Sequence, residues 1–281
     1  MSAQLVLIAS YPKSGNTWVR LILETLRRDE TVSINDIGIG AYGAQRRRLF
    51  DEFAPAEASE LLPYEIEEIL PDIYASMESD SPIFLKVHDR MRKTPSGKWL
   101  FPPQCVKAVI YVARHPLDVV MSYANHRAIP AIEAARLMGN EEHVIPSAGT
   151  SLQRSLEERP GSWSSNVLSW IDGSPYEVTL VRYEDLYADP ATEFARIARA
   201  AGIVVSEGII NRAVEATRFA RLQREERTNG FRERPTYSPA FFREGRPDSW
   251  IGKLEVEFCQ ELMRTHSQAA ERLGYRLAAN S

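Results

Sequence analysis

The chain has 281 residues, of which 44% are hydrophobic and 26% charged, as is typical of a soluble globular enzyme with a sizeable core. Its net charge of −4 argues against general nucleic-acid binding, which normally requires a basic excess. The two cysteines, Cys105 and Cys259, are far apart and lack ligand-type neighbours. This excludes a disulfide framework and a zinc site, and it is typical of a reducing compartment.

The first predicted elements are a strand and a helix joined by a short loop. Leu5–Ala9 is a continuous apolar run, the pattern of a strand buried on both faces of a sheet. The run breaks at Ser10–Gly15, and residues 16–28 then show the spacing of an amphipathic helix. A strand, a glycine-containing loop and a helix form the typical opening of an α/β fold.

Strands and helices alternate along the rest of the chain. Apolar runs predict further strands over residues 83–87, 108–112 and 177–181. Helical patterns cover residues 117–127, 190–201 and 253–273. Asp189 is the expected N-cap of the second of these helices, and Gly274 the expected end of the third. The alternation predicts one α/β domain over residues 1–281, with a mostly parallel central sheet flanked by helices.

Three long stretches fit neither pattern and are predicted to be irregular. They cover residues 31–80, 128–161 and 218–247, and the third is rich in arginine. Long irregular insertions in a compact α/β domain are usually lids or substrate walls, and we expect that role here.

The sequence gives no indication of export or of membrane insertion. The N-terminal residues lack a basic segment followed by a long apolar one, and no apolar run approaches the ~18 residues of a membrane-spanning helix. We therefore expect a cytoplasmic protein that binds neither membranes nor nucleic acid.

The loop after the first strand reads Tyr11-Pro-Lys-Ser-Gly-Asn-Thr-Trp18 and predicts an anion site. A glycine-bearing turn between a strand and a helix directs free backbone N–H groups and the helix dipole at a bound anion. Lys13 adds a charge, and Ser14 and Thr17 add hydroxyl donors. In the nucleoside triphosphate loop a lysine follows the last glycine, whereas here Asn16 stands at that position. The sequence therefore predicts a phosphate loop of a different design.

Two further strand ends carry functional side chains. His88 follows the strand over 83–87, where parallel sheets bind ligands, and its usual pKa suits a general base. Arg114 leaves the strand over 108–112, and Ser122 lies on the second turn of the helix that follows, so both can reach one phosphate. Their alternatives are a structural histidine and an arginine paired with Asp118 at the surface. The other histidines are assigned structural or surface roles: His115, His126, His143 and His266.

These segments resemble the PAPS-dependent, cytosolic-type sulfotransferases. The family's phosphosulfate loop reads Tyr-Pro-Lys-Ser-Gly-Thr-Thr-Trp, from which only Asn16 departs. Lys86-Val-His88 resembles its Lys-Thr-His segment, and residues 114–122 resemble its element for the 3′-phosphate. Tyr183-Glu-Asp, Thr217-Arg-Phe219 and residues 242–250 resemble three later elements, in the family's order. The resemblance covers nearly the whole chain and implies an α/β fold with a P-loop-like phosphosulfate loop.

The resemblance implies a function and a set of site residues. PAPS is the expected co-substrate, without a metal, and His88, Lys13 and Lys86 are the expected catalytic residues. Ser122 is expected to hold Lys13 until the donor binds, and aromatic rings are expected on both faces of the adenine. The nucleotide is expected to contact Lys13, Ser14, Gly15, Asn16, Thr17, Trp18, Arg114, Ser122, Tyr183, Thr217, Phe219, Arg243, Glu244 and Gly245.

The last of these segments departs most from the family pattern. Glu244 replaces a lysine and Pro247 replaces the second glycine. A carboxylate beside a phosphate repels it, so we expect the side chain of Glu244 to face away. Arg246 or an arginine within residues 218–234 is expected to supply the missing charge.

Two other functions remain open at this point. A kinase or other nucleoside triphosphatase needs an acidic residue for magnesium near the end of a strand beside the phosphate loop, and Arg114 stands there instead. A non-catalytic nucleotide-binding protein has no need of a histidine beside a lysine loop. The resemblance implies a hydroxyl acceptor, and the Asn16 variant of the loop is similar to bacterial members that act on small-molecule natural products. The sequence is compatible with a homo-oligomer.

Overall fold

A parallel four-stranded sheet lies at the centre of the computed structural model, which describes residues 4–41, 43–145 and 155–277. The strand order is β2-β1-β3-β4, and every neighbouring pair is parallel. The strands of this described part are β1 (Leu5–Ser10), β2 (Ile83–Val87), β3 (Val106–Ala113) and β4 (Val178–Arg182). The predicted parallel sheet and its four strands are therefore confirmed, with small shifts at the strand ends.

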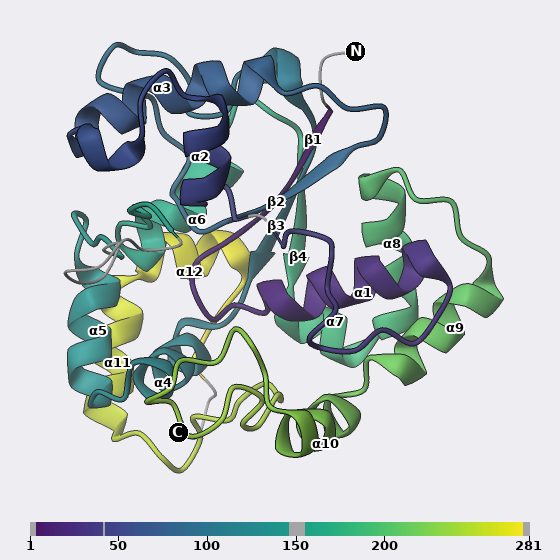
Figure 1. Ribbon diagram of the computed structural model, residues 1–281. Helices are drawn as coiled ribbons and strands as arrows, with labels where there is room; N and C mark the ends of the chain where they lie inside the picture. The colour runs from purple at the N-terminus through teal and green to yellow at the C-terminus, as the bar shows by residue number, and fades with distance from the viewer. Residues whose placement is uncertain (1–3, 42, 146–154, 278–281) are drawn as a thin grey trace.

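Helices connect the strands and cover both faces of the sheet (Figure 1). Those that follow the first strands are α1 (Asn16–Arg28), α2 (Arg47–Phe53), η1 (Ala58–Glu60), α3 (Pro63–Ser76), η2 (Pro103–Cys105), α4 (Pro116–Arg127), α5 (Ala131–Gly139) and α6 (Trp163–Ile171). Those that follow β4 are α7 (Tyr183–Ala188), α8 (Pro190–Ala201), α9 (Glu207–Ala216), α10 (Phe219–Asn229), α11 (Val256–Thr265) and α12 (Ser267–Leu273). Among the described residues no helix is both long enough and apolar enough to cross a membrane.

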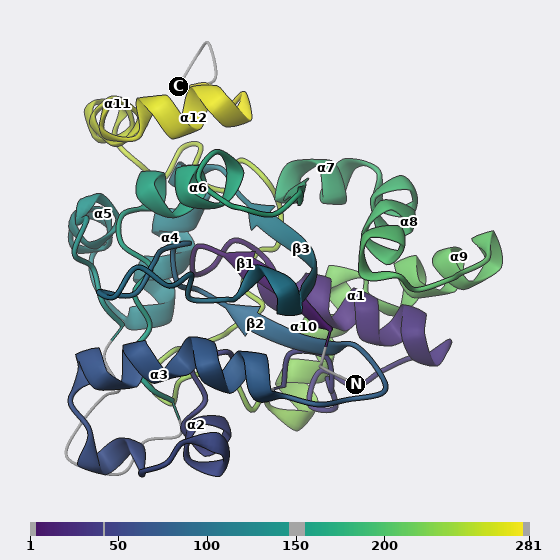
Figure 2. The same cartoon turned by 90° about the horizontal axis from the view of Figure 1, so that it is seen from above.

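The alternation of side chains along the strands divides the core into two layers. Leu5 and Leu7 of β1 face a layer built with α3, α4, α6, α11 and α12. Val6 and Ile8 face the opposite layer, built with α1, α8 and α9. All four side chains are fully buried, which explains why β1 reads as an uninterrupted apolar run. Figure 2 shows the two groups of helices on either side of the sheet.

The prediction of one helix over residues 253–273 is wrong. The helix begins at Val256 and is interrupted at His266, which ends α11 and precedes α12. The ring of His266 is buried, and its Nδ1 lies 2.9 Å from Oγ of Ser164 at the start of α6. This contact with another helix holds the backbone of His266 outside the helical region, and residue spacing alone does not reveal it.

The prediction that residues 31–80, 128–161 and 218–247 are irregular is also wrong in part. They contain α2 and α3, α5, and α10 respectively. Helix α10 is rich in charged residues, and few of its side chains are buried, among them Leu222. A helix that buries so narrow a stripe has a weak apolar period, because most of its surface faces solvent.

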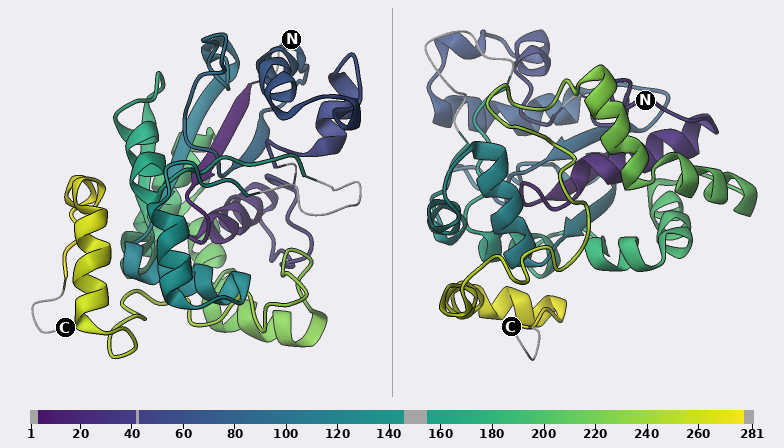
Figure 3. Two further views of the ribbon diagram at one scale, coloured as in Figure 1. Left: turned by 90° about the vertical axis from the view of Figure 1, so that its left-hand side faces the viewer. Right: turned by 90° about the horizontal axis from the view of Figure 1, so that it is seen from below.

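The site is positioned by the ends of the parallel strands. All four strands point the same way, so the residues that follow β1, β2, β3 and β4 meet at one edge of the sheet. Helix α1 begins at this edge. The chain after α10 passes across the same side of the molecule, as the view from below shows (Figure 3, right).

Candidate active site

A cavity of about 560 Å³ lies at the carboxyl edge of the sheet. Its walls come from the β1–α1 loop, the ends of β2 and β3, helix α4 and the chain after α10. Most of the residues expected at a nucleotide site line it: Lys13, Gly15, Asn16, Thr17, Trp18, Lys86, His88, Arg114, Ser122, Tyr183, Phe219, Arg243, Glu244 and Gly245. Ser14 and Thr217 lie behind the lining. The structure thus brings together segments that are up to about 230 residues apart in the chain.

The β1–α1 loop is shaped to expose backbone N–H groups. Lys13 and Gly15 adopt the left-handed region, with φ of 71° and 110°. Helix α1 begins at Asn16 without a side-chain cap; the amides of Trp18 and Val19 bond to the backbone oxygen of Gly15, which leaves those of Asn16 and Thr17 to face an anion. A Cβ on Gly15 would lie 2.7 Å from the ring of Tyr183, so this position also requires glycine for space. Oγ of Ser14 is buried, 1% of this residue being exposed, and has no hydrogen-bond partner among the described residues.

Lys13 extends into the cavity as a partly deprotonated amine. Burial, and then the charges of Lys86 and Arg114, lower its pKa to about 7. Its Nζ lies 3.5 Å from Nδ1 of His126 and 3.8 Å from the ring centroid of Phe241. Lys13 is therefore held by His126 and Phe241 in this structure, and the expected partner, Ser122, only lines the cavity nearby.

His126 is a cavity residue that the sequence analysis placed elsewhere. It was assigned a structural or surface role, but its ring lines the cavity beside Lys13. Burial, and then the charge of Lys13, lower the pKa of His126 to about 3, so the neutral ring accepts a hydrogen bond from the lysine. His126 lies one turn after Ser122 in α4 and so on the same face of the helix, and this spacing could have indicated that its ring also faces the cavity.

His88 directly follows β2, and contacts of its ring and of its backbone fix its orientation. The residue is 9% exposed and lines the cavity. Its Nδ1 lies 2.9 Å from the backbone oxygen of Ser10, and its own backbone oxygen accepts from Nδ2 of Asn166 at 3.0 Å. Burial, and then the charge of Lys86, lower the pKa of His88 well below its usual value. The ring is therefore neutral near pH 7, and one of its nitrogens keeps a free lone pair.

Arg114, just after β3, adds a further cationic side chain to the cavity wall. It is 7% exposed, and its guanidinium lies 4.2 Å from the ring centroid of Tyr183. One terminal nitrogen donates to the backbone oxygen of Arg246 at 3.2 Å and lies 4.0 Å from Asp118, while Nε is buried without a partner in the described part of the chain. The alternative of an arginine paired with Asp118 holds in part: the two groups lie 4.0 Å apart, but both are buried at the cavity and not at the surface.

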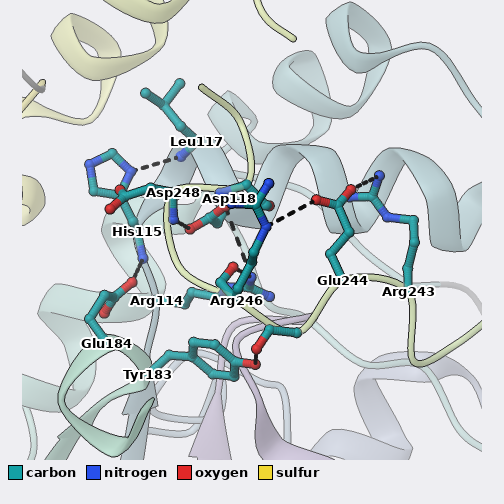
Figure 4. A network of polar contacts seen from close by, with 12 residues as sticks. Arg114, His115, Leu117, Asp118, Tyr183, Glu184, Arg243, Glu244, Arg246 and Asp248 are labelled. Atoms are coloured by element: carbon teal, nitrogen blue, oxygen red, sulfur yellow. Dashed lines mark hydrogen bonds and ion pairs between the residues drawn. The ribbon is translucent and has the colours of Figure 1, made fainter. Parts of the chain in front are cut away.

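Asp118 fastens the chain that covers Arg114. Its carboxylate accepts the backbone N–H groups of Asp248 and Ser249 at 2.9 Å each, and the hydroxyl of Ser249 at 2.6 Å. These bonds hold the turn after Pro247 against the first turn of α4 (Figure 4). Asp118 thereby has a structural role in the site that the sequence analysis did not assign.

Aromatic rings surround the region where the resemblance places an adenine. Trp18 donates from Nε1 to the backbone oxygen of Thr217 at 3.1 Å, and its ring centroid lies 5.4 Å from that of Tyr183. Tyr183, the first residue of α7, donates to the backbone oxygen of Gly245 at 2.9 Å. Phe219 packs directly against Gly245, where an added Cβ would lie 2.0 Å from the ring. Phe219 both packs in the interior and lines the cavity.

Glu244 borders the cavity, but its charge is neutralised. Its carboxylate bonds with Nζ of Lys253 at 2.6 Å and lies 2.9 Å from Arg243. Lys253 does not line the cavity, whereas Arg243 does, so the carboxylate lies between a lysine outside the cavity wall and an arginine within it; that Glu244 faces away from a bound phosphate stays a prediction. Arg246 contributes its backbone oxygen to Arg114, while its side chain is exposed.

An ion pair between a buried arginine and a more exposed glutamate ties the cavity wall to helix α1. Arg20 is 1% exposed and makes two hydrogen bonds to the carboxylate of Glu233, at 2.9 and 3.0 Å. Its Nε also donates to the backbone oxygen of Ile39 at 3.0 Å. Glu233 lines the cavity after α10, and no local pattern in the sequence indicated this pairing over 213 positions.

The other half of the cavity is lined by polar side chains. Its walls include Gln45, Arg46, Tyr123, Arg127, Glu158 and Tyr237. Residues 128–161 were expected to form a substrate wall, and Ile145 and Glu158 do line the cavity. Residues 146–154 of that stretch lie outside the described part of the chain.

Comparison with known proteins identifies the family. The model of the family described as the sulfotransferase domain matches residues 4–274. The chain belongs to the sulfotransferase family. Human sulfotransferase 1C2 is 25% identical over 266 residues, covering 89% of this chain and 78% of the relative. Rat sulfotransferase 1A1 is 28% identical over 262 residues, covering 89% and 79% respectively.

Solved structures show the same fold. Retinol dehydratase in complex with androsterone and inactive cofactor PAP matches with a TM-score of 0.60 and 18% identity, covering 98% of this chain and 82% of that one. Mouse sulfotransferase SULT7A1 complexed with PAP matches with a TM-score of 0.58 and 19% identity, covering 98% and 90%. The expected fold and the expected sulfotransferase enzyme are thus confirmed, and the kinase and the non-catalytic alternatives are set aside.

Proposed function

We propose that this sulfotransferase transfers a sulfuryl group from PAPS to a hydroxyl group of a small molecule or natural product, with His88 as general base and without a metal. One observation carries the proposal: a neutral histidine, a buried lysine and a buried arginine border the same cavity. A base, a cation for the leaving group and a second anion site are what this reaction requires.

The residues present fit a nucleotide with two phosphate groups. The amides of the α1 N-terminus, Lys13 and the unpartnered hydroxyl of Ser14 would hold the 5′-phosphate. Arg114, whose Nε is buried without a partner among the described residues, and Ser122 would hold the 3′-phosphate. A buried polar atom without a partner is costly, so these atoms favour a ligand that satisfies them.

His88 and Lys13 would divide the proton and charge transfers between them. The donor supplies a sulfuryl group bonded to the oxygen of its 5′-phosphate, and this oxygen leaves with an electron pair. His88 would take the acceptor hydroxyl proton on Nε2 as that hydroxyl oxygen bonds to sulfur. Lys13 and Lys86 would stabilise the negative charge on the departing phosphate oxygen. A positioned general base of this kind contributes about 10²–10⁴-fold to the rate.

The proposal of metal-free transfer rests on Lys13, Lys86 and Arg114. These cationic side chains line the cavity and can balance the charge that a metal would otherwise balance. The described residues hold no group of three or more histidine, cysteine, aspartate or glutamate side chains arranged as metal ligands. We further propose a cytoplasmic protein of one domain over residues 1–281. Its two cysteines are buried and unpaired, which supports a reducing environment.

A substitution at His88 tests the proposal. His88→Asn keeps a side-chain N–H near Ser10 but removes the base. We expect it to abolish transfer to a panel of phenol, sugar and amino-alcohol acceptors, while PAP still raises the melting temperature as in the wild type. ATP with magnesium, and ADP, should raise the melting temperature less than PAP. Transfer near the wild-type rate in the variant would contradict the role of His88, and equal shifts by ATP and PAP would contradict the donor.

A further inference from the structure

Asn16 is directed at the sheet and not at the cavity centre. Its side chain is 4% exposed, and Nδ2 donates to the backbone oxygen of Ile8 at 2.8 Å and to Oγ of Ser10 at 3.2 Å. A backbone oxygen only accepts hydrogen bonds, so the contact with Ile8 fixes which end of the amide is the nitrogen. Both hydrogens of Nδ2 are thereby used within β1, and none remains for a phosphate.

Ser10 contacts both Asn16 and the ring of His88. It is the last residue of β1 and fully buried. Its backbone oxygen lies 2.9 Å and its Oγ 3.3 Å from Nδ1 of His88. Because the backbone oxygen can only accept, Nδ1 carries the proton and Nε2 is the basic nitrogen. The side chains of Asn16, Ser10 and His88 thus form one buried row from α1 to β2.

We propose that Asn16 is a positioning residue for His88, acting through Ser10. The side chain of Asn16 locks Ser10 from one side, and both oxygens of Ser10 then hold the ring so that its unprotonated Nε2 is available to the cavity. The proposal rests on the proposed role of His88 as base. It assigns a purpose to the one position where the loop departs from the pattern it resembles.

Threonine at this position cannot reproduce the contacts. A hydroxyl has one hydrogen to donate, whereas Asn16 donates to two acceptors in β1. The loop would still present its backbone N–H groups, Lys13 and Ser14 to the donor. Asn16→Thr should therefore affect His88 more than it affects donor binding.

The backbone of His88 is held independently of this row. Nδ2 of Asn166 donates to the backbone oxygens of His88 and Pro160, both at 3.0 Å, and Oδ1 of Asn166 accepts from Tyr111 at 2.8 Å. The strand end that carries His88 therefore stays in place when Ser10 or Asn16 is changed. The expected change is confined to the ring, its rotation and its tautomer.

Four variants test the proposal. Asn16→Thr and Ser10→Ala each break the row, Ser10→Thr keeps the hydroxyl, and Asn125→Thr is the control. Asn125 donates to the backbone oxygen of Ala240 at 3.0 Å, so the control loses a comparable bond without touching the row. Long-range ¹H–¹⁵N NMR reports the tautomer of each histidine, and the signals of His88 are assigned by their loss in His88→Asn. PAP affinity and the kcat of transfer are measured alongside.

We expect the wild type, Ser10→Thr and Asn125→Thr to show His88 protonated only at Nδ1. The backbone oxygen of Ser10 remains in Asn16→Thr and Ser10→Ala, so Nδ1 should stay the main site of protonation. Loss of the second contact should admit a minor population protonated at Nε2 and lower kcat by about tenfold, with PAP affinity within about threefold of the wild type. The double variant, Asn16→Thr with Ser10→Ala, should lose no more kcat than the more impaired single variant, since both substitutions act on the ring of His88.

Two results would overturn the proposal. One is an unchanged tautomer of His88 in both Asn16→Thr and Ser10→Ala. The other is a loss of PAP affinity in Asn16→Thr that matches its loss of kcat, because Asn16 would then act on the donor. The NMR result does not depend on turnover. If His88→Asn kept full activity while the tautomers changed as expected, the positioning would stand and only the role of His88 as base would fail.

Discussion

Gly245 offers a substitution whose effect can be worked out from the structure. It has φ of 62° and lies against the ring of Phe219, which lines the cavity. An added Cβ would lie between 2.0 and 2.4 Å from the three nearest ring atoms, well inside van der Waals contact. Gly252, seven residues further on, has φ of 72° and nothing within 4 Å of an added Cβ. Gly252→Ala is therefore a matched control for backbone strain without the clash.

The two contributions can be estimated separately. A left-handed conformation costs alanine about 1–2 kcal/mol, and both variants share this term. In Gly245→Ala the ring of Phe219 must also move by more than about 1 Å to regain ordinary contact. If Phe219 stacks on the adenine, losing that contact costs about 1–3 kcal/mol of binding, which is roughly 5- to 150-fold in Kd.

Calorimetric titration with PAP and thermal unfolding measure the two effects. We expect both variants to unfold at lower temperature than the wild type, with the larger decrease for Gly245→Ala. Only Gly245→Ala should weaken PAP by the stated factor, and Gly252→Ala should bind it as the wild type does. Wild-type affinity in a folded Gly245→Ala protein would refute the reasoning, because Phe219 could then not be part of the adenine site.

Two further predictions concern charge. If Lys13, whose pKa is about 7, acts on the donor as a cation as proposed, kcat/KM for the donor should fall as pH rises through 7. Lys13→Arg, which stays charged, should remove that decline, and a decline unchanged in this variant would assign it to another group. Arg114→Ala should raise the Kd of PAP by about 10- to 150-fold, because charge-assisted hydrogen bonds are lost. The Kd of AMP, which has no 3′-phosphate, should rise much less. Equal increases for PAP and AMP in titrations would contradict the 3′-phosphate assignment.

The centre of the sheet was predictable because β1 and most of β3 are buried. The fully buried run Leu5–Ala9 is apolar at every position, which leaves an uninterrupted run in the sequence. Parallel strands end at one edge, so the motifs that follow them also meet there, and this explains why most of the expected site residues line one cavity. Periodicity failed where burial is one-sided or partial, as in α10, and where a remote contact interrupts a helix, as at His266.

Other parts of the site depend on contacts that have no local signature. An arginine in an amphipathic helix is normally expected to face solvent. Arg20 is nevertheless buried, because Glu233 and the backbone oxygen of Ile39 accept the hydrogen bonds of its guanidinium. The carboxylate of Asp118 bonds to residues about 130 positions away. Such partners become neighbours only when the whole chain has folded, so no spacing within a segment could indicate them.

The pairing of Arg20 with Glu233 makes helix α1 support two walls of the cavity. The first turn of α1 forms the phosphate loop's helix end, and its second turn carries Arg20, which anchors the covering chain. Because Arg20 of α1 bonds to Glu233 of the chain after α10, two walls of the cavity are joined by one ion pair, and neither wall can shift alone while that pair is intact.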